Sequence, residues 1–103
     1  MSVQRIRDAI RRKQPVSATY LGRRRILCPH LIGTKNGVWN VLSYQSGGES
    51  GSGLSTNRAG NWRCMRVSEL SRVAPAPHHE WGTAPRDTRQ QTCVDVVDTE
   101  SAC

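Results

Sequence analysis

The chain has 103 residues, a net charge of +7, and five aromatic residues, none of which is phenylalanine. This length supports one modest core and excludes a second independent domain. Residues 1–25 contain eight Arg or Lys and one Asp, whereas residues 75–103 contain two Arg and five acids. A basic front half with an acidic tail favours an anionic partner, or a tail that covers the basic surface.

The opening residues indicate the compartment that we expect. Residues 2–13 are charged throughout and lack the apolar stretch of about 7–15 residues that a secretory signal needs. No run approaches the about 18 apolar residues of a membrane span. We therefore expect a cytoplasmic protein without membrane contact, in which four cysteines are free thiols: Cys28, Cys64, Cys93 and Cys103.

The first elements have clear periodicities. Val3, Ile6 and Ile10 recur at helical spacing, so the sequence predicts an amphipathic helix that Ser2 can cap and Pro15 ends. The period then changes to two, which predicts a half-buried strand over 16–20 that ends at Gly22. The next apolar run, 25–34, contains Pro29, and a proline places a strand at an edge or at a bulge.

The remaining strands are separated by glycine and proline. Lys35-Asn36-Gly37 predicts a tight turn, followed by a strand over 38–44. The Gly/Ser-rich segment 46–61 predicts a loop. Further strands are expected at 62–67 and 70–74. Residues 92–97 favour either a last strand or a tail.

One helix followed by about five short antiparallel strands predicts a mainly β (α+β) fold, and specifically a small Sm-like/SH3-like barrel. The chain resembles a stand-alone WYL domain, a barrel usually attached to helix-turn-helix regulators. The resemblance covers about residues 3–74. It depends on the basic helix, the strand with Tyr20, the Cys28-Pro29-His30 stretch, Trp39-Asn40-Val41 in place of Trp-Tyr-Leu, and the 63–70 strand. We accordingly expect a domain over 1–77 and an acidic extension over 78–103.

Some features depart from the family. Asn40 and Val41 replace the name-giving Tyr and Leu, and Glu69 stands where the family commonly has an arginine. The 46–61 loop is longer than is usual. The residues ahead of the expected barrel contain no helix-turn-helix pattern, so we do not expect a transcription factor.

The resemblance implies a non-enzymatic regulatory module that binds an anionic ligand, such as a nucleotide or a nucleic-acid fragment. The residues expected to bind the ligand are Arg63, Tyr44, Tyr20 and His30. A guanidinium offers a planar fork of donors to phosphate, and aromatic rings stack on bases. The alternatives are a surface Arg63 that is solvated or paired with Glu69, and tyrosines that only pack.

Basic residues form a second set of candidates, which would contact nucleic-acid phosphates: Arg11, Arg12, Lys13, Arg23, Arg24 and Arg25. The alternative is a solvated basic face. A metal site is not expected because no CxxC pair exists, and we expect no cofactor. An enzyme is not expected either, because nucleophile and phosphate-loop motifs are missing. The second functional hypothesis is a protein-interaction or assembly subunit, which includes a homo-oligomer formed through strand edges.

Overall fold

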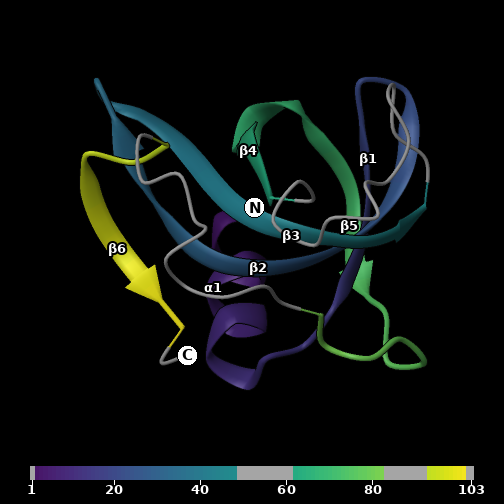
Figure 1. Cartoon of the computed structure of the whole chain (residues 1–103). Helices are drawn as coiled ribbons and strands as arrows, with labels where there is room; N and C mark the ends of the chain where they lie inside the picture. Colours follow the sequence, from purple (N-terminus) through teal and green to yellow (C-terminus); the bar gives the residue numbers. More distant parts are fainter. Residues whose placement is uncertain (1, 49–61, 83–92, 102–103) are drawn as a thin grey trace.

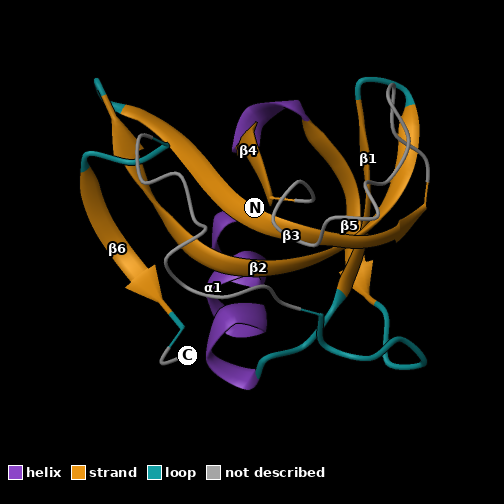
Figure 2. Ribbon diagram, in the orientation of Figure 1, coloured by secondary structure: helices purple, strands orange, loops and turns teal. Residues whose placement is uncertain are grey.

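The computed structural model describes residues 2–48, 62–82 and 93–101, which form one helix and one antiparallel sheet (Figures 1 and 2). The mainly β fold with one N-terminal helix is confirmed. The elements in chain order are α1 (Ser2–Arg12), β1 (Val16–Tyr20), β2 (Arg23–Lys35), β3 (Val38–Gly48), β4 (Trp62–Arg66), β5 (Leu70–Pro75) and β6 (Val96–Glu100).

The strand β2 pairs with β1, β3 and β6. The strand order is β4-β3-β2-β1-β5, and β6 pairs with β2 beyond the end of β1. Neighbouring strands are antiparallel throughout. The strands β4 and β5 stand at the two ends of this order, and within the described residues the sheet is not closed as a barrel. The Sm-like/SH3-like barrel therefore stays a prediction.

Local sequence explains the irregular points of β2 and β3. The register of these strands shifts between Pro29 and Leu31, so the proline lies at a bulge of a central strand rather than at an edge. Asn36 and Gly37 have φ angles of 52° and 78°, the conformation that a two-residue hairpin turn requires. The strand β3 continues to Gly48, so the prediction of a loop from residue 46 was wrong for its first three residues. Residues 49–61 lie outside the described part.

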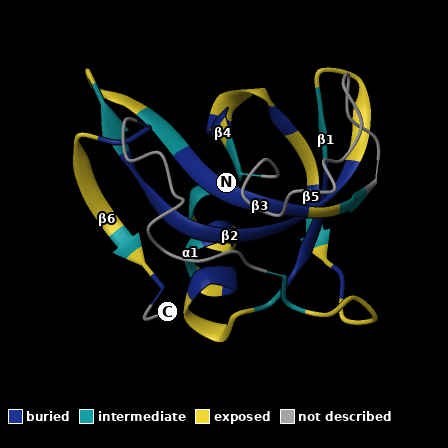
Figure 3. Ribbon diagram, viewed as in Figure 1, coloured by how far each residue is buried: buried dark blue, intermediate teal, exposed yellow. Residues whose placement is uncertain are grey.

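The helix α1 covers one face of the sheet, which we call the inner face. Ile6, Ala9 and Ile10 lie in a buried cluster with residues of β1–β5 that include Leu27 and Met65. In Figure 3 the buried side of the helix is turned toward the sheet. The apolar stripe recognised in the sequence is therefore the stripe that packs.

The opposite face, which we call the outer face, is covered by chain from the C-terminal part. Cys93 and Val94 lie in a buried cluster with Leu31 and Leu42. A Cβ atom at Gly33 would overlap the Val94 side chain and the Val96 carbonyl oxygen, so only glycine fits there. The amide of Asp95 donates to Thr34 O at 2.9 Å, and β6 follows. Of the two possibilities for 92–97, the structure shows a strand, although it begins at Val96.

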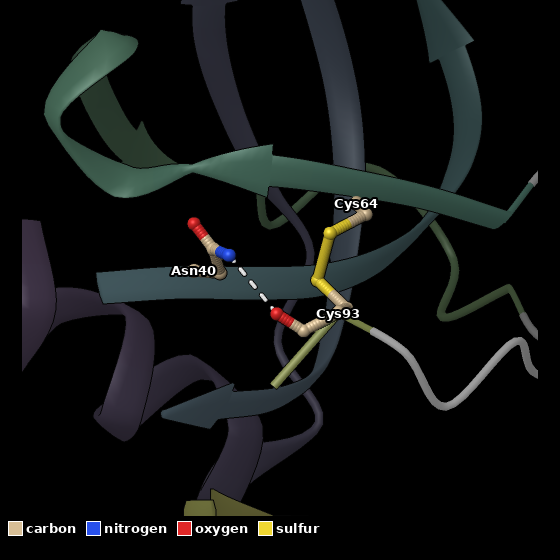
Figure 4. Close-up of a disulfide and its surroundings, with 3 residues drawn as sticks. All are labelled: Asn40, Cys64 and Cys93. Carbon is tan, nitrogen blue, oxygen red and sulfur yellow. Dashed lines mark hydrogen bonds between the residues drawn. A yellow bond between two sulfur atoms is a disulfide. The ribbon is translucent and has the colours of Figure 1, made fainter. Parts of the chain in front are cut away.

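A disulfide joins Cys64 of β4 to Cys93 (Figure 4). The Asn40 amide Nδ2 donates to Cys93 O at 2.9 Å and holds the same segment. The prediction of free thiols was wrong for these two cysteines. The partners are 29 residues apart, and a count of cysteines does not reveal which of them meet. Cys28 is free and buried, and Cys103 lies outside the described residues.

No helix within the described residues is long and apolar enough to cross a membrane.

Candidate functional site

The inner face changes from apolar to polar along β3. Val41 belongs to the core under α1, whereas Ser43 and Gln45, the next residues on this face, are buried polar side chains. The partner strand changes in the same way, because Met65 pairs with Val41 and Arg63 pairs with Ser43. One end of the inner face is therefore hydrocarbon, and the other end, the polar end, is lined by hydrogen-bonding groups.

Arg25 lies at this polar end. It pairs with the core residue Ala18 of β1, so its side chain is on the inner face, and only 6% of its surface is exposed. Its guanidinium carbon lies 5.1 Å from the centre of the Tyr20 ring, a cation–π arrangement. Nη1 donates to Gln45 Oε1 at 3.4 Å, and Nε is buried without a hydrogen-bond partner among the described residues.

The electrostatics of Arg25 are unfavourable. Burial lowers the pKa of its guanidinium, and the positive charge of Arg63 lowers this pKa further. Within the described residues no carboxylate lies within ion-pairing distance of Arg25. A buried cation without an opposite charge costs several kcal/mol as an order of magnitude. An anion bound between Arg25 and Arg63 would offset that cost.

Tyr20 and Gln45 contact the Arg25 guanidinium at the polar end. Burial raises the pKa of the Tyr20 phenol, and the negative charge of Glu69 raises it further, so the hydroxyl stays protonated at neutral pH. Gln45 Nε2 donates to Gly47 O at 3.1 Å, which turns the amide oxygen toward Arg25. Both neighbours therefore orient the guanidinium without neutralising it.

The four predicted ligand residues do not lie together. Arg63 and Tyr20 are on the inner face, whereas Tyr44 and His30 are on the outer face. The Tyr44 ring packs on Trp62 with 5.5 Å between ring centres. The His30 ring is buried against Trp81 at 4.6 Å, and its Nδ1 lies 2.7 Å from Cys28 O. In these positions Tyr44 and His30 pack the outer face.

The aromatic cluster on the outer face consists of His30, Tyr44, Trp62 and Trp81, and it also contains the free thiol of Cys28. Gly82 N donates to Cys28 Sγ at 3.2 Å, and burial raises the pKa of this thiol. A raised pKa keeps the sulfur protonated and unreactive at neutral pH. Trp81 and Gly82 are thus held against the outer face of the sheet, and the Cys28 thiol beside them stays protonated.

The six predicted phosphate-contacting residues fall into three places. Arg11, Arg12 and Lys13 are exposed at the C-terminal end of α1. Arg23 and Arg24 are exposed at the start of β2, whereas Arg25 is buried. The run 23–25 is therefore not one basic surface, because neighbouring residues of a strand point to opposite faces.

Sequence reasoning missed Ser43 and Gln45, and it assigned Arg25 to the wrong kind of surface. The sequence signal for these residues was the alternation of faces along a strand, which has a period of two residues. Residues 25 and 27 share a face, as do 41, 43 and 45, so polar side chains at 25, 43 and 45 continue the core-facing rows of Leu27 and Val41. A polar residue in a core-facing row indicates either a buried network or a site.

Searches against protein-family models, characterised proteins and solved structures gave no match. The described residues contain no group of three or more His, Cys, Asp or Glu side chains placed to hold a metal ion.

Proposed function

We propose that the protein is a non-enzymatic regulatory module that binds a small phosphate-bearing anion, such as a nucleotide, at the polar end of the inner face. Arg25 and Arg63 hold the anion, and Gln45 and Tyr20 orient Arg25. The observation that carries this proposal is the buried Arg25 guanidinium, which has no carboxylate partner in the described residues and an unpartnered Nε.

The chemistry of the donors supports a phosphate group. A guanidinium presents several N–H groups in one plane, which matches two oxygens of a phosphate or carboxylate. Arg63 lies close enough for its positive charge to lower the pKa of Arg25, and two cations at this separation favour a dianion over a monoanion. The Tyr20 ring beneath Arg25 keeps that guanidinium in place, so little side-chain entropy is lost on binding.

The resemblance to WYL domains agrees with this proposal, because it also implies a small β domain that binds an anionic ligand. In this view Arg25 replaces the cation that the family has where this chain has Glu69. The closed Sm-like barrel and the domain division at residue 77 belong to the same proposal.

Titration calorimetry at low salt with adenosine 5′-monophosphate and inorganic pyrophosphate tests the site. We expect binding by the wild type. Arg25→Gln should weaken it about 10- to 100-fold, because one charged hydrogen-bonding partner contributes about 1.5–3 kcal/mol. Arg63→Gln should act in the same direction.

The matched control is Arg11→Gln, which removes the same charge from an exposed position on α1, away from the polar end. It should change the affinity less than threefold, since a surface charge acts only at long range. If neither probe binds at millimolar concentration, or if Arg11→Gln weakens binding as much as Arg25→Gln, the proposed function is wrong.

A cytoplasmic location is part of the proposal, and it makes the state of the Cys64–Cys93 disulfide important. Disulfides persist in oxidising compartments, whereas cytosolic thiols are kept reduced. The two cysteines lie on the outer face, so the calorimetry should give the same affinity with and without reductant.

A further inference from the structure

A second basic site lies on the outer face, where β2, β1 and β5 run side by side. Thr19 of β1 pairs with Arg24 on one side and with Ser71 on the other, so these three side chains form a row across the strands. Ser17, two residues back along β1, lies on the same face. These residues line a groove of about 670 Å³ together with Arg72.

A β-bulge brings Arg72 to this groove. Between Ser17 and Thr19 the strand β1 advances two residues, whereas its partner β5 advances three, from Ala74 to Ser71. Arg72 has a φ of 54°, a conformation that residues other than glycine rarely adopt. Bulges of this kind redirect a side chain, and strained backbone gathers at functional positions. Here the redirected side chain is a cation, and it lies beside a row of hydroxyls.

The lining of the groove matches a phosphate backbone. It offers two guanidiniums and three hydroxyl groups, and none of its described lining residues is acidic. Arg, Ser and Thr side chains are the groups that commonly contact phosphate oxygens in nucleic-acid complexes. The lining residues that the structure describes include no aromatic ring, so they offer no surface on which bases would stack, and recognition would be independent of sequence.

The groove shares one lining residue with a cleft beside α1. Ala74 borders the groove and also borders this second cleft, of about 370 Å³, between α1 and β5. That cleft carries Arg5 and Arg12 beside one acid, Asp8. A backbone lying in the groove can therefore extend from Arg24 and Arg72 toward Arg12.

We propose that this outer groove, formed by Ser17, Thr19, Arg24, Ser71 and Arg72, binds the phosphodiester backbone of a nucleic acid without reading its sequence. The groove is separate from the small-anion site, because Arg24 and Arg25 lie on opposite faces of β2. One chain would thus bind a small anion on its inner face and a polyanion on its outer face.

Fluorescence anisotropy with a labelled 20-nucleotide dT strand and a 20-base-pair duplex tests this proposal on the full chain. We expect binding at 50 mM NaCl that weakens with salt. The double variant Arg24→Gln/Arg72→Gln should lose about tenfold in affinity, and the slope of log K against log salt should fall by about 1.4 for single strands or 1.8 for duplex. Thr19→Val, which keeps the side-chain shape, should weaken binding by less than the double variant.

Arg23→Gln/Arg66→Gln is the matched control, because it removes the same charge from exposed positions outside the groove. It should keep at least half of the wild-type affinity and the wild-type salt slope. Arg25→Gln should also leave nucleic-acid binding unchanged, which separates this site from the proposed function. Absence of binding to both nucleic acids at 50 mM NaCl, or equal losses in the double variant and the control, overturns the inference.

Discussion

Two arginines lie over aromatic rings at different places in this molecule, and their surroundings are opposite. Arg7 of α1 lies 5.4 Å from the Trp39 ring and forms two hydrogen bonds to the Asp98 carboxylate, at 2.7 and 3.0 Å. Arg25 of β2 lies 5.1 Å from the Tyr20 ring and has no carboxylate partner in the described residues. The paired arginine is partly exposed, whereas the unpaired one is buried.

The difference distinguishes structural from functional use of a cation. Arg7 joins α1 to β6, and its bidentate ion pair completes that contact. Arg25 has no charged partner among the described residues, because its hydrogen-bond acceptor is the neutral amide oxygen of Gln45 and its ring contact is with Tyr20. A fold that only needed volume at this position would be served by an apolar side chain. This contrast is the reason for our proposal that Arg25 binds an external anion.

The largest expected effect comes from removing the disulfide just before β6, the strand that contains Asp98. The double variant Cys64→Ser/Cys93→Ser removes the covalent link that precedes β6. In the loop-entropy model, a disulfide closing a loop across 29 residues contributes about 3–4 kcal/mol. Urea unfolding should show this loss. Affinity for adenosine 5′-monophosphate should stay within twofold of wild type, because the polar end lies on the other face; a large loss would show that the two regions are coupled.

The sequence predicted the elements well because their patterns are local. The stripe of Ile6 and Ile10, the Asn36-Gly37 turn and the alternation in 16–20 depend on neighbours along the chain, and the helix and β1 lie where they were expected. The cover of the outer face was not predictable in this way. Cys93 and Val94 contact Leu31 and Leu42, which lie 51–63 residues away in the sequence, and no periodicity predicts such a contact.

The sequence did not show which of the four expected ligand residues share a face. Arg63 and Tyr20 lie on the inner face, whereas Tyr44 and His30 lie on the outer face. The strand β2 carries a bulge between Pro29 and Leu31, which shifts the alternation beyond it. The alternation of faces along a strand can be followed only as far as a bulge. Because the sequence does not reveal the position of this bulge, the face of His30 could not be derived from it.

A smaller effect compares the two arginines directly through stability. Arg25→Met should leave the free energy of unfolding unchanged or raise it by up to about 2 kcal/mol, because a buried charge is replaced by hydrocarbon. Arg7→Met should lower it, because Asp98 loses its partner. Urea unfolding without added phosphate measures both. Strong destabilisation by Arg25→Met would mean that this arginine is as structural as Arg7, and the comparison would fail.

The smallest effect is the pH dependence of stability that arises from the ion pair between Arg7 and Asp98. Hydrogen bonds from Arg7 and Thr99 lower the pKa of Asp98 below its usual value. A carboxyl whose pKa is lower in the folded state stabilises the fold above its unfolded pKa of about 3.9, and this contribution disappears as the pH falls through the lowered value. The wild type should therefore melt at a slightly higher temperature than Asp98→Asn at pH 6, and this difference should shrink by pH 3.

The same titration separates the two arginines. Because no described carboxylate pairs with Arg25, the difference in melting temperature between wild type and Arg25→Met should be nearly constant from pH 6 to pH 3. If that difference instead changes with pH as the Asp98→Asn difference does, an acid titrates against Arg25. The buried cation would then already have its counter-charge within the chain, and the argument for an external anion would lose its basis.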